Sequence, residues 1–454
     1  MNPLISTDSY KLSHYKQYPP NTEHIYSYIE PRSGSGEIVV TGINEFVMQL
    51  MISLTYGNVE ELRELSRNHG VPFNETGFVR LLEKYGDTNE FPLLVRGLPE
   101  GSVVTKGTVV ATIVNTDPEF PWLTSFFETL FLRCVWYPST VASISRDCKK
   151  TILAGLEATG DPSLIDFKLH DFGARGVSSG ESAMYGGAAH LINFKGTDTL
   201  EALAYVRNTY NTEDAGFSIP ATEHSTVTSW GRENEKDMYA AFIKENLGEG
   251  KTAACVSDSY NIWEALDIWK ELEPLILETG GTLVIRPDSG DPIMTPIAVT
   301  KYLLNQFGYT TNDKGFRVLP DHIRVIQGDG ITRESIDLII EGFISRGMST
   351  DNIAFGMGGG LLQHCNRDTY GWAMKCSAAC VDGEWRDVYK DPIGGGKTSK
   401  KGLVTDNPRA PLDPVDVFYT GPFMNTGLVT YYGGSCGYTR PPEAWETIRQ
   451  RAAV

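Results

Sequence analysis

Seven short polar loops between Ile165 and Leu362 carry the residue types that could do chemistry. Each loop follows a short apolar segment and precedes a helix-like segment. The loops read HDFGARG (170–176), KGTD (195–198), TEHS (222–225), SDSY (257–260), RPDSG (286–290), QGDG (327–330) and GMGGG (356–360). Glycine amides and arginine bind phosphate, and aspartate binds hydroxyl groups or a metal ion. The loops therefore suit a bound sugar phosphate.

A plainer explanation is available for each loop taken singly. Glycine and aspartate are common in turns and helix caps, whatever the protein does. That explanation does not account for an arginine or histidine beside the turn residues in three of the seven loops.

The elements that must position these loops read as parallel strands followed by helices. TLVIRP (282–287), IRVIQ (323–327) and NIAFG (352–356) are short apolar runs, typical of strands buried on both faces. A strand–loop–helix unit recurs about every thirty residues, which matches βα repeats that close towards a barrel. Active sites of such folds lie at the carboxyl ends of the strands, where these loops are expected.

The flanking segments follow a different pattern. Residues 1–145 show helix periodicity at 42–55, 58–69 and 76–85, strand alternation at 102–114 and a buried helix at 121–136. Beyond residue 371 we expect a hairpin that turns at Asp382-Gly383, then a second hairpin and a short helix that pack back on the N-terminal segment. We therefore expect an α/β protein with two domains. Residues 146–370 form an irregular (β/α) barrel-like domain, and residues 1–145 with 371–454 form an α+β domain.

Composition narrows the choice of partners. The 454 residues carry a formal charge of −17, which argues against nucleic acid because phosphate backbones are bound by basic faces. No run of eighteen apolar residues exists, so no membrane span is expected. The seven cysteines are scattered, and the first twenty residues lack a signal pattern. We therefore expect a cytoplasmic protein with reduced thiols.

Several single residues are candidates for binding. GGGKT (394–398) fails as a P-loop, because Asp391 stands where the pattern needs glycine. We interpret it as a basic flap over a phosphate, since lysines are dense around it. GMGGG before a helix is a seat for a monophosphate that Arg367 could close.

Three further candidates lie in the repeated loops. His224 beside Glu223 could be catalytic, although a lone histidine is more often structural. Phe172 could stack on a planar ring instead of packing in the core. Asp288 and Asp329 suit ribose hydroxyls or Mg²⁺, and capping is an equally good explanation for either one.

Taken together, the motifs resemble the nicotinamide phosphoribosyltransferase family of type II phosphoribosyltransferases. The resemblance covers nearly the whole chain in order. It rests on TDSYKLSHYKQYPP (7–20), YSYIEPR (26–32), NTDPEFPWLTSFFET (115–129), WYPSTVA (136–142), KLHDFGARGVSS (168–179), NFKGTDT (193–199), EHST (223–226), VSDSY (256–260), IRPDSGDP (285–292), RVIQGDG (324–330), IAFGMGGGLLQ (353–363) and SKKG (399–402).

The resemblance implies a homodimer with active sites at the interface. The enzyme would make nicotinamide mononucleotide and pyrophosphate from nicotinamide and phosphoribosyl pyrophosphate. It also implies that ATP hydrolysis is coupled to synthesis through a phosphorylated histidine at His224. The transfer passes through an oxocarbenium-like state, which needs positioning, cations and a metal, for which we expect Mg²⁺.

The resemblance also implies roles for individual residues. The ring would lie between Phe172 and Tyr10 of the partner subunit, with Asp198 accepting from the carboxamide. Arg286 and Asp288 would hold ring and ribose, and with His224 they form the catalytic group. The ribose 5′-phosphate would be lined by Gly328, Asp329, Gly358 and Gly359. Pyrophosphate would be surrounded by Arg175, His224, Arg32, Arg367, Lys390 and Lys397.

Two departures and three alternatives accompany this resemblance. The vertebrate enzymes carry an acid where this chain has Asn261, and that acid is expected to orient the phosphorylated histidine. Ala174 replaces an aromatic residue of those enzymes.

Three alternative functions stand against this resemblance. A nicotinate phosphoribosyltransferase would share the architecture, but an acid at Asp198 would repel a carboxylate. An inactive interaction protein would not need the full set of charged residues. A Schiff-base aldolase has only Lys195 as a candidate at a strand end.

Overall fold

The computed structural model describes residues 2–88, 90–394, 398–422, 425–434 and 437–454. The chain divides into two compact units. Unit 1 comprises Met1–Ala142 and Asn366–Ala452, and unit 2 comprises Ser143–Cys365 and Ala453–Val454. These boundaries lie close to the expected ones at residues 145 and 370.

One helix crosses the first boundary along the chain. The sequence predicted a buried helix at 121–136, but α5 (Glu128–Thr159) continues through Pro138 well beyond residue 136. Proline removes one helical hydrogen bond and usually breaks a helix. Here Val135, Val141 and Ala142 on either side of it are buried, and their packing outweighs that loss.

Unit 1 is built on an antiparallel sheet. Among the described residues the strand order is β15-β14-β1-β5-β3-β16-β17. The strands are β1 (Thr22–Glu30), β3 (Leu93–Gly97), β5 (Ala111–Asn115), β14 (Ala373–Val381), β15 (Glu384–Asp387), β16 (Val429–Gly433) and β17 (Tyr438–Thr439), with the separate pair β2 (Ile38–Val39) and β4 (Val103–Val104). Asp382 and Gly383 both have positive φ, as a tight hairpin turn requires. The expected hairpin is thus confirmed, and β16 returns to pair with β3.

The helices of unit 1 bury an aromatic core against this sheet. They are η1 (Pro3–Ile5), η2 (Ser9–Lys16), α1 (Ile43–Met51), α2 (Tyr56–His69), α3 (Glu75–Tyr85), α4 (Leu123–Phe126), η7 (Pro414–Asp416) and α15 (Trp445–Arg451). Phe46 of α1 stacks on Phe131 of α5 with ring centroids 4.0 Å apart. The three expected helices between residues 42 and 85 are therefore confirmed.

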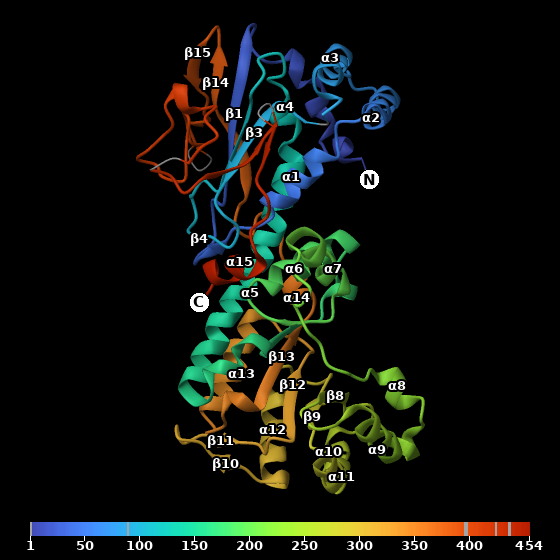
Figure 1. The fold of residues 1–454 in the computed structure, drawn as a ribbon. Coiled ribbons are helices and arrows are strands. Elements are labelled where there is room, and N and C mark those ends of the chain that lie inside the picture. Colours follow the sequence, from blue (N-terminus) through green and yellow to red (C-terminus); the bar gives the residue numbers. More distant parts are fainter. Residues whose placement is uncertain (1, 89, 395–397, 423–424, 435–436) are drawn as a thin grey trace. The chain divides into compact units, whose positions relative to one another are not determined.

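Unit 2 contains a parallel sheet with helices outside it (Figure 1). The strand order in the described chain is β7-β6-β13-β12-β9-β8. The strands are β6 (Leu169–Asp171), β7 (Gly196–Thr197), β8 (Thr252–Val256), β9 (Thr282–Arg286), β12 (Ile323–Gln327) and β13 (Ile353–Met357), with a small hairpin of β10 (Thr310–Thr311) and β11 (Arg317–Val318).

The seventh expected strand, before TEHS, is not a strand. Residues 217–222 make one parallel bridge to each edge of the sheet, Phe217 to Gly196 and Ala221 to Ala254. Pro220 has no amide hydrogen to give to a strand ladder, so regular pairing is interrupted. The bridges still close the six strands into a ring, and the expected barrel-like fold is confirmed.

Helices follow the strands on the outside of the ring. They are α6 (Gly180–Leu191), α7 (Leu200–Tyr210), α8 (His224–Thr228), α9 (Glu235–Asn246), α10 (Ile262–Glu271), α11 (Glu273–Thr279), α12 (Met294–Phe307), α13 (Arg333–Ile344) and α14 (Gly359–Leu362), with the 3-10 turns η3 (Pro162–Phe167), η4 (Ala174–Gly176), η5 (Arg232–Asn234) and η6 (Thr350–Asn352). Side-chain caps explain where several begin: Ser179 accepts from Ser182, and Thr332 from Ser335. The helix expected after GMGGG is only the four-residue α14.

Strand alternation decides which side chains enter the barrel. Ala254, Val284 and Ile326, from three neighbouring strands, form one apolar layer, and Phe172 and Ala354 pack against it. Side chains two residues further along a strand lie on the same face. Arg286 follows Val284 in this way, so it reaches the carboxyl-terminal mouth of the barrel.

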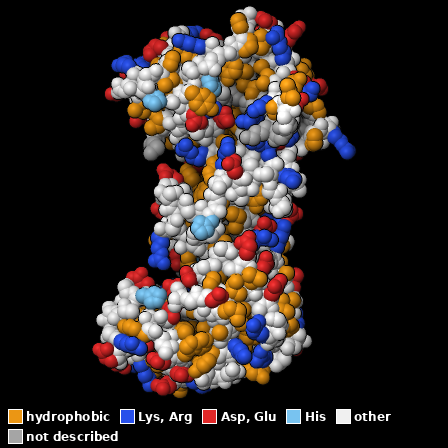
Figure 2. Space-filling model, turned by 180° about the vertical axis from the view of Figure 1, so that it is seen from behind, with side chains coloured by type: hydrophobic (Ala, Val, Ile, Leu, Met, Phe, Trp, Pro, Cys, Tyr) orange, Lys and Arg blue, Asp and Glu red, His pale blue; other side chains and the backbone are white. Residues whose placement is uncertain are grey.

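The surface gives two further observations. None of the helices in the described part of the chain is both long and apolar enough to cross a membrane. On the face drawn in Figure 2, acidic and basic side chains are interspersed among the residues shown.

Candidate active site

Phe172 forms the floor of the barrel mouth. A Cβ on Gly356 would lie 1.9 Å from Cε2 of Phe172, and a Cβ on Gly328 would lie 3.1 Å from the same atom. The ring can therefore cover the ends of β12 and β13 only because these two positions are glycine. The ring packs against the apolar layer but is only partly buried, so it could also support a planar ligand.

Asp198 lies at the end of β7, beside this floor. Its Oδ1 is 2.9 Å from His170 Nε2 and accepts a hydrogen bond of 2.5 Å from Ser218 Oγ. Burial would raise the pKa of the Asp198 carboxyl, but the hydrogen bonds and charges of His170, with Ser218 and Arg286, lower it on balance. Asp198 is therefore a carboxylate, and its Oδ2 makes none of these contacts.

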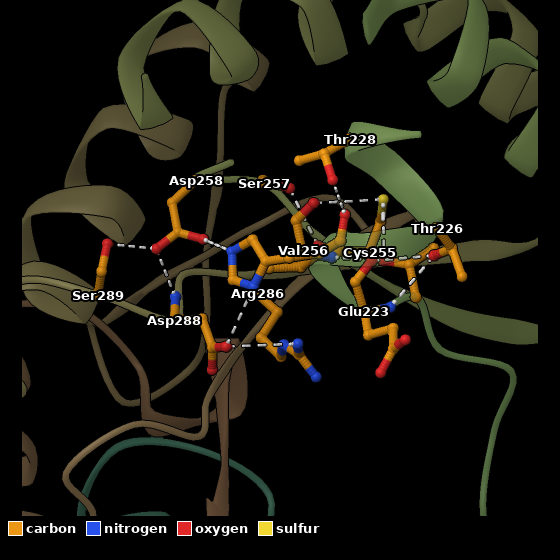
Figure 3. A network of polar contacts seen from close by, with 12 residues as sticks. Glu223, Thr226, Thr228, Cys255, Val256, Ser257, Asp258, Arg286, Asp288 and Ser289 are labelled. Carbon is orange, nitrogen blue, oxygen red and sulfur yellow. Dashed lines mark hydrogen bonds and ion pairs between the residues drawn. The ribbon is translucent and has the colours of Figure 1, made fainter. Parts of the chain in front are cut away.

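His224 begins α8 and lies between two aspartates. Its Nε2 is 3.1 Å from Asp258 Oδ1, and its Nδ1 is 3.7 Å from Asp288 Oδ2. Asp258 Oδ2 accepts from the Asp288 amide at 2.9 Å and from Ser289 Oγ at 2.5 Å. Figure 3 shows how Asp258, Asp288 and Ser289 gather around this point.

The acid in contact with His224 is thus Asp258, whereas Asn261 caps a helix and its side chain makes its contacts there. Asn261 is the N-cap of α10: its side chain accepts from the Trp263 amide and donates to Glu264. The side-chain amide of Asn261 makes its hydrogen bonds to its own helix, because a cap residue turns its side chain towards the helix that it begins. The acid lies three residues earlier, in the same SDSY loop.

Arg286 connects the two groups of acids. Its Nη2 is 3.6 Å from Asp288 Oδ2, and its charge also acts on Asp198. Its Nε is buried and has no hydrogen-bond partner among the described residues. A buried N–H without a partner is costly, which favours a ligand oxygen at this place.

The remaining predicted residues of unit 2 lie on the neighbouring loops of the mouth. Arg175 is exposed on η4, which packs against α14, where Gly358 and Gly359 form the start of the helix. The loop after β12 carries Gly328 and the exposed Asp329, whose carbonyl accepts from Gln327 Nε2 at 2.9 Å.

Five predicted residues belong to unit 1, and the structure describes four of them. Tyr10 lies on η2 with 59% of its surface exposed. Arg32 lines a pocket of about 540 Å³ with Glu30, Ser399 and Lys400. Lys390 is exposed and its backbone pairs with Ser399. Arg367 forms an ion pair of 2.9 Å with Asp368. Lys397 lies outside the described residues.

Four residues near these groups were missed from the sequence. Burial lowers the pKa of Lys375 more than Glu128 raises it, and the cations Arg32, Lys11 and Arg367 lower it further. Lys375 thus belongs with the basic residues of unit 1. His170, Ser218 and Asp258 lie in or next to the repeated polar loops, and their place there was the available signal. Lys195, the aldolase candidate, is paired with Asp166 at 3.0 Å instead.

A metal ion would need help from its ligand here. Across the described residues, no three His, Cys, Asp or Glu side chains are grouped so that they could hold a metal ion. Mg²⁺ commonly binds through one or two carboxylates and the phosphates of a substrate. Asp288, with 29% of its side chain exposed at the mouth, fits that mode.

Comparisons with known proteins show which family this chain resembles. Residues 167–417 match the model of the nicotinate phosphoribosyltransferase (NAPRTase) family, and residues 2–93 match the N-terminal domain of nicotinamide phosphoribosyltransferase. The nicotinamide phosphoribosyltransferase of Xanthomonas campestris is 47% identical over 89% of this chain and 87% of its own. The enzyme of that name from Acinetobacter baylyi is 32% identical over 89% and 88%.

Solved structures give the same fold. Human nicotinic acid phosphoribosyltransferase matches with a TM-score of 0.55 and 15% identity, over 98% of this chain and 92% of that one. Nicotinate-nucleotide pyrophosphorylase from Pyrococcus furiosus matches with a TM-score of 0.55 and 13% identity, over 99% and 94%.

Proposed function

Because the chain belongs to the nicotinate phosphoribosyltransferase family of pentosyltransferases, we propose that it makes nicotinamide mononucleotide for NAD biosynthesis. Its substrates would be nicotinamide and phosphoribosyl pyrophosphate, and pyrophosphate would leave. The curated relatives named above carry this activity in their names.

The observation that carries the choice of nicotinamide is the carboxylate of Asp198. Oδ1 is occupied by His170 and Ser218, so Oδ2 is available to accept from an NH₂ group. An amide offers that donor, whereas the carboxylate of nicotinic acid would meet a like charge. The unpartnered Nε of Arg286 then suits the carboxamide oxygen, and Phe172 supports the ring.

The transfer itself asks for positioning and charge. Displacing pyrophosphate builds positive charge on the ribose and negative charge on the leaving group, so no protein nucleophile is required. Asp288 would hold the ribose, while Gly328, Asp329, Gly358 and Gly359 would line its 5′-phosphate. Arg175 of the same unit would stabilise pyrophosphate. Mg²⁺, held by Asp288 and the phosphates, would neutralise negative charge on the leaving pyrophosphate.

ATP coupling is a further part of the proposal, and the position of His224 supports it. Asp258 accepts from Nε2–H, which leaves the lone pair on Nδ1. Asp288 is 3.7 Å from Nδ1, beyond hydrogen-bond distance, so that nitrogen remains nucleophilic. It would take the γ-phosphoryl group of ATP and release ADP.

A homodimer in the cytoplasm completes the proposal, with Tyr10 of the partner subunit above the nicotinamide ring. The exposure of Tyr10 supports an intermolecular role. Tyr10→Ala and Phe172→Ala should each be poorly active, and a mixture after subunit exchange should regain about a quarter of wild-type activity, because half the dimers hold one intact site. No recovery after verified exchange would assign both aromatics to one chain.

The direct test is to incubate the protein with Mg²⁺, phosphoribosyl pyrophosphate and either nicotinamide or nicotinic acid. Chromatography with standards identifies the mononucleotide. We expect nicotinamide mononucleotide to dominate. Preferential formation of nicotinic acid mononucleotide would make the protein a nicotinate phosphoribosyltransferase.

A further inference from the structure

Tyr10 lies in a segment of unit 1 that is bonded to the junction of α4 and α5. Thr7 Oγ1 donates to the Phe126 carbonyl at 2.7 Å, and Thr129 Oγ1 donates to Asp8 Oδ2 at 2.6 Å. Both bonds involve residues that precede Tyr10 closely in the chain, so they fix the backbone that leads into η2. The Tyr10 ring itself projects from this fixed backbone and is 59% exposed.

Lys11, the next residue, places a cation over the Tyr10 ring. Its Nζ is 5.2 Å from the ring centroid, within the range in which a cation is attracted to the face of an aromatic ring. The same Nζ donates to Glu128 Oε2 at 2.6 Å, and the Lys11 side chain is 2% exposed. A buried charge needs such a partner, and the pair keeps the cation in one place over the ring.

His14 makes a second contact with the same ring. The His14 and Tyr10 ring centroids are 5.1 Å apart, and the ring planes are inclined by 62°. Burial lowers the pKa of His14, and the charge of Lys11 lowers it further, against the opposing charge of Glu128. His14 is therefore neutral at pH 7, and Lys11 supplies the positive charge beside the ring. The two contacts hold the ring, and its exposed part remains open to a ligand.

Building on the proposed function, we propose that Lys11 is a positioning residue for nicotinamide: it holds the Tyr10 ring in the orientation that stacks on the nicotinamide of the other subunit. A freely rotating tyrosine would lose side-chain entropy when the ligand binds, and that loss weakens binding. A ring that is already held loses less. Substrate and transition state stack on the ring alike, so the effect falls on KM for nicotinamide and not on kcat.

The experiment is steady-state kinetics on the double variant Lys11→Gln/Glu128→Gln, which removes the cation, keeps the net charge and leaves no charge unpaired. We expect its KM for nicotinamide to rise about fivefold. Its kcat and its KM for phosphoribosyl pyrophosphate should change less than about twofold. Lys11→Arg retains a cation that can pair with Glu128 and lie over an aromatic ring, so its KM for nicotinamide should stay close to that of wild type.

Two comparisons separate positioning from a general structural role. In a Tyr10→Leu background the same double variant should not raise the KM for nicotinamide further, because the ring through which Lys11 acts is gone. Lys16 is the matched control: it lies on the same η2, and its Nζ is 5.4 Å from the centroid of the Tyr15 ring. Lys16→Gln removes an equivalent contact from a different tyrosine and should leave every kinetic constant unchanged.

Three results would overturn the role of Lys11 while the proposed function stands. They are an unchanged KM for nicotinamide in the double variant, an equal rise in its KM for phosphoribosyl pyrophosphate, and a rise that persists in the Tyr10→Leu background. Circular dichroism checks folding, and if the double variant is unfolded, Lys11→Met takes its place in the same comparisons. If wild type makes no nicotinamide mononucleotide, the proposed function fails and this proposal fails with it.

Discussion

Two histidine–aspartate pairs at the barrel mouth use the same chemistry in opposite orientations. In His170–Asp198 the imidazole is 14% exposed and the carboxylate 49%. In His224–Asp258 the imidazole is 42% exposed and the carboxylate 5%. The first pair presents an acid to the ligand, with the histidine behind it. The second presents a histidine, with the acid behind it.

The difference shows how one pair of residue types serves two tasks. A carboxylate at the front accepts from a donor such as an amide, and an imidazole at the front can attack a phosphoryl group. In each pair the partner behind fixes which atom is available. The identity of the buried member therefore matters as much as that of the exposed one.

The largest effect should come from reversing the direction of the hydrogen bond between residue 258 and His224 Nε2. In Asp258→Asn the side-chain amide can donate to Nε2, which moves the imidazole proton to Nδ1 and blocks the nucleophile. We expect phosphorylation of His224 by ATP to slow at least about a hundredfold, measured as acid-labile, base-stable label. Asn261→Asp is the control and should change the rate less than about twofold. A large gain in Asn261→Asp would return the orienting role to that position.

A smaller effect is expected at the other pair. Asp198→Asn removes the charge that repels nicotinic acid, and its amide can donate to a carboxylate. The ratio of kcat/KM for nicotinamide to that for nicotinic acid should fall about tenfold to a hundredfold. Glu273→Gln is the control, because Glu273 pairs with His322 just before β12, at the amino end of the barrel strands. An unchanged ratio in Asp198→Asn would remove this acid from substrate choice.

The role of the Phe172 ring can be tested by placing a methyl group at two different distances from it. Gly356→Ala places a methyl group 1.9 Å from the Phe172 ring, and Gly328→Ala places one 3.1 Å from it. We expect the KM for nicotinamide to rise about tenfold in the first and only a few-fold in the second. Equal effects would mean that the ring is not the platform.

The smallest effect concerns a third histidine, His190, which is buried and exposes no group to a ligand. His190 is fully buried, with Nδ1 2.9 Å from Ser145 Oγ and Nε2 3.2 Å from the Gly196 carbonyl, and burial lowers its pKa to about 4. Between that pH and about 6.5 the unfolded chain binds a proton that the folded protein does not, so stability falls as pH falls. From pH 7 to 5.5 wild type should lose about 1 kcal/mol more than His190→Gln in urea unfolding. Parallel losses would assign the acid sensitivity elsewhere.

The sequence predicted the barrel, the α+β unit and the loops of the site, because strand–loop–helix repeats and Gly-rich loops are local patterns. It misplaced the partner of His224, since the spacing of SDSYN does not show which side chain turns inward. Asn261 was taken by its own helix and Asp258 was not. His170 was not singled out, because its contact with Asp198 joins strands that alternation alone does not pair. The strand predicted before TEHS was also wrong. Hydrophobicity suggested a strand there, but Pro220 interrupts the backbone pairing.

The segment 217–222 that closes the barrel has a consequence for its motions. It is attached by isolated bridges: the Thr222 amide donates to the Ala254 carbonyl, and the Val256 amide donates to the Thr222 hydroxyl. We expect this seam to open more readily than the regular ladders beside it. Ser218 lies on this seam, and His224 follows directly after it. A ligand that engages both Asp198 and His224 should therefore favour the closed form of the seam by mass action. Amide hydrogen exchange at Thr197, Thr222 and Ala254 should slow when nicotinamide and phosphoribosyl pyrophosphate bind. The exchange rate of these three amides would then report whether the barrel mouth is occupied.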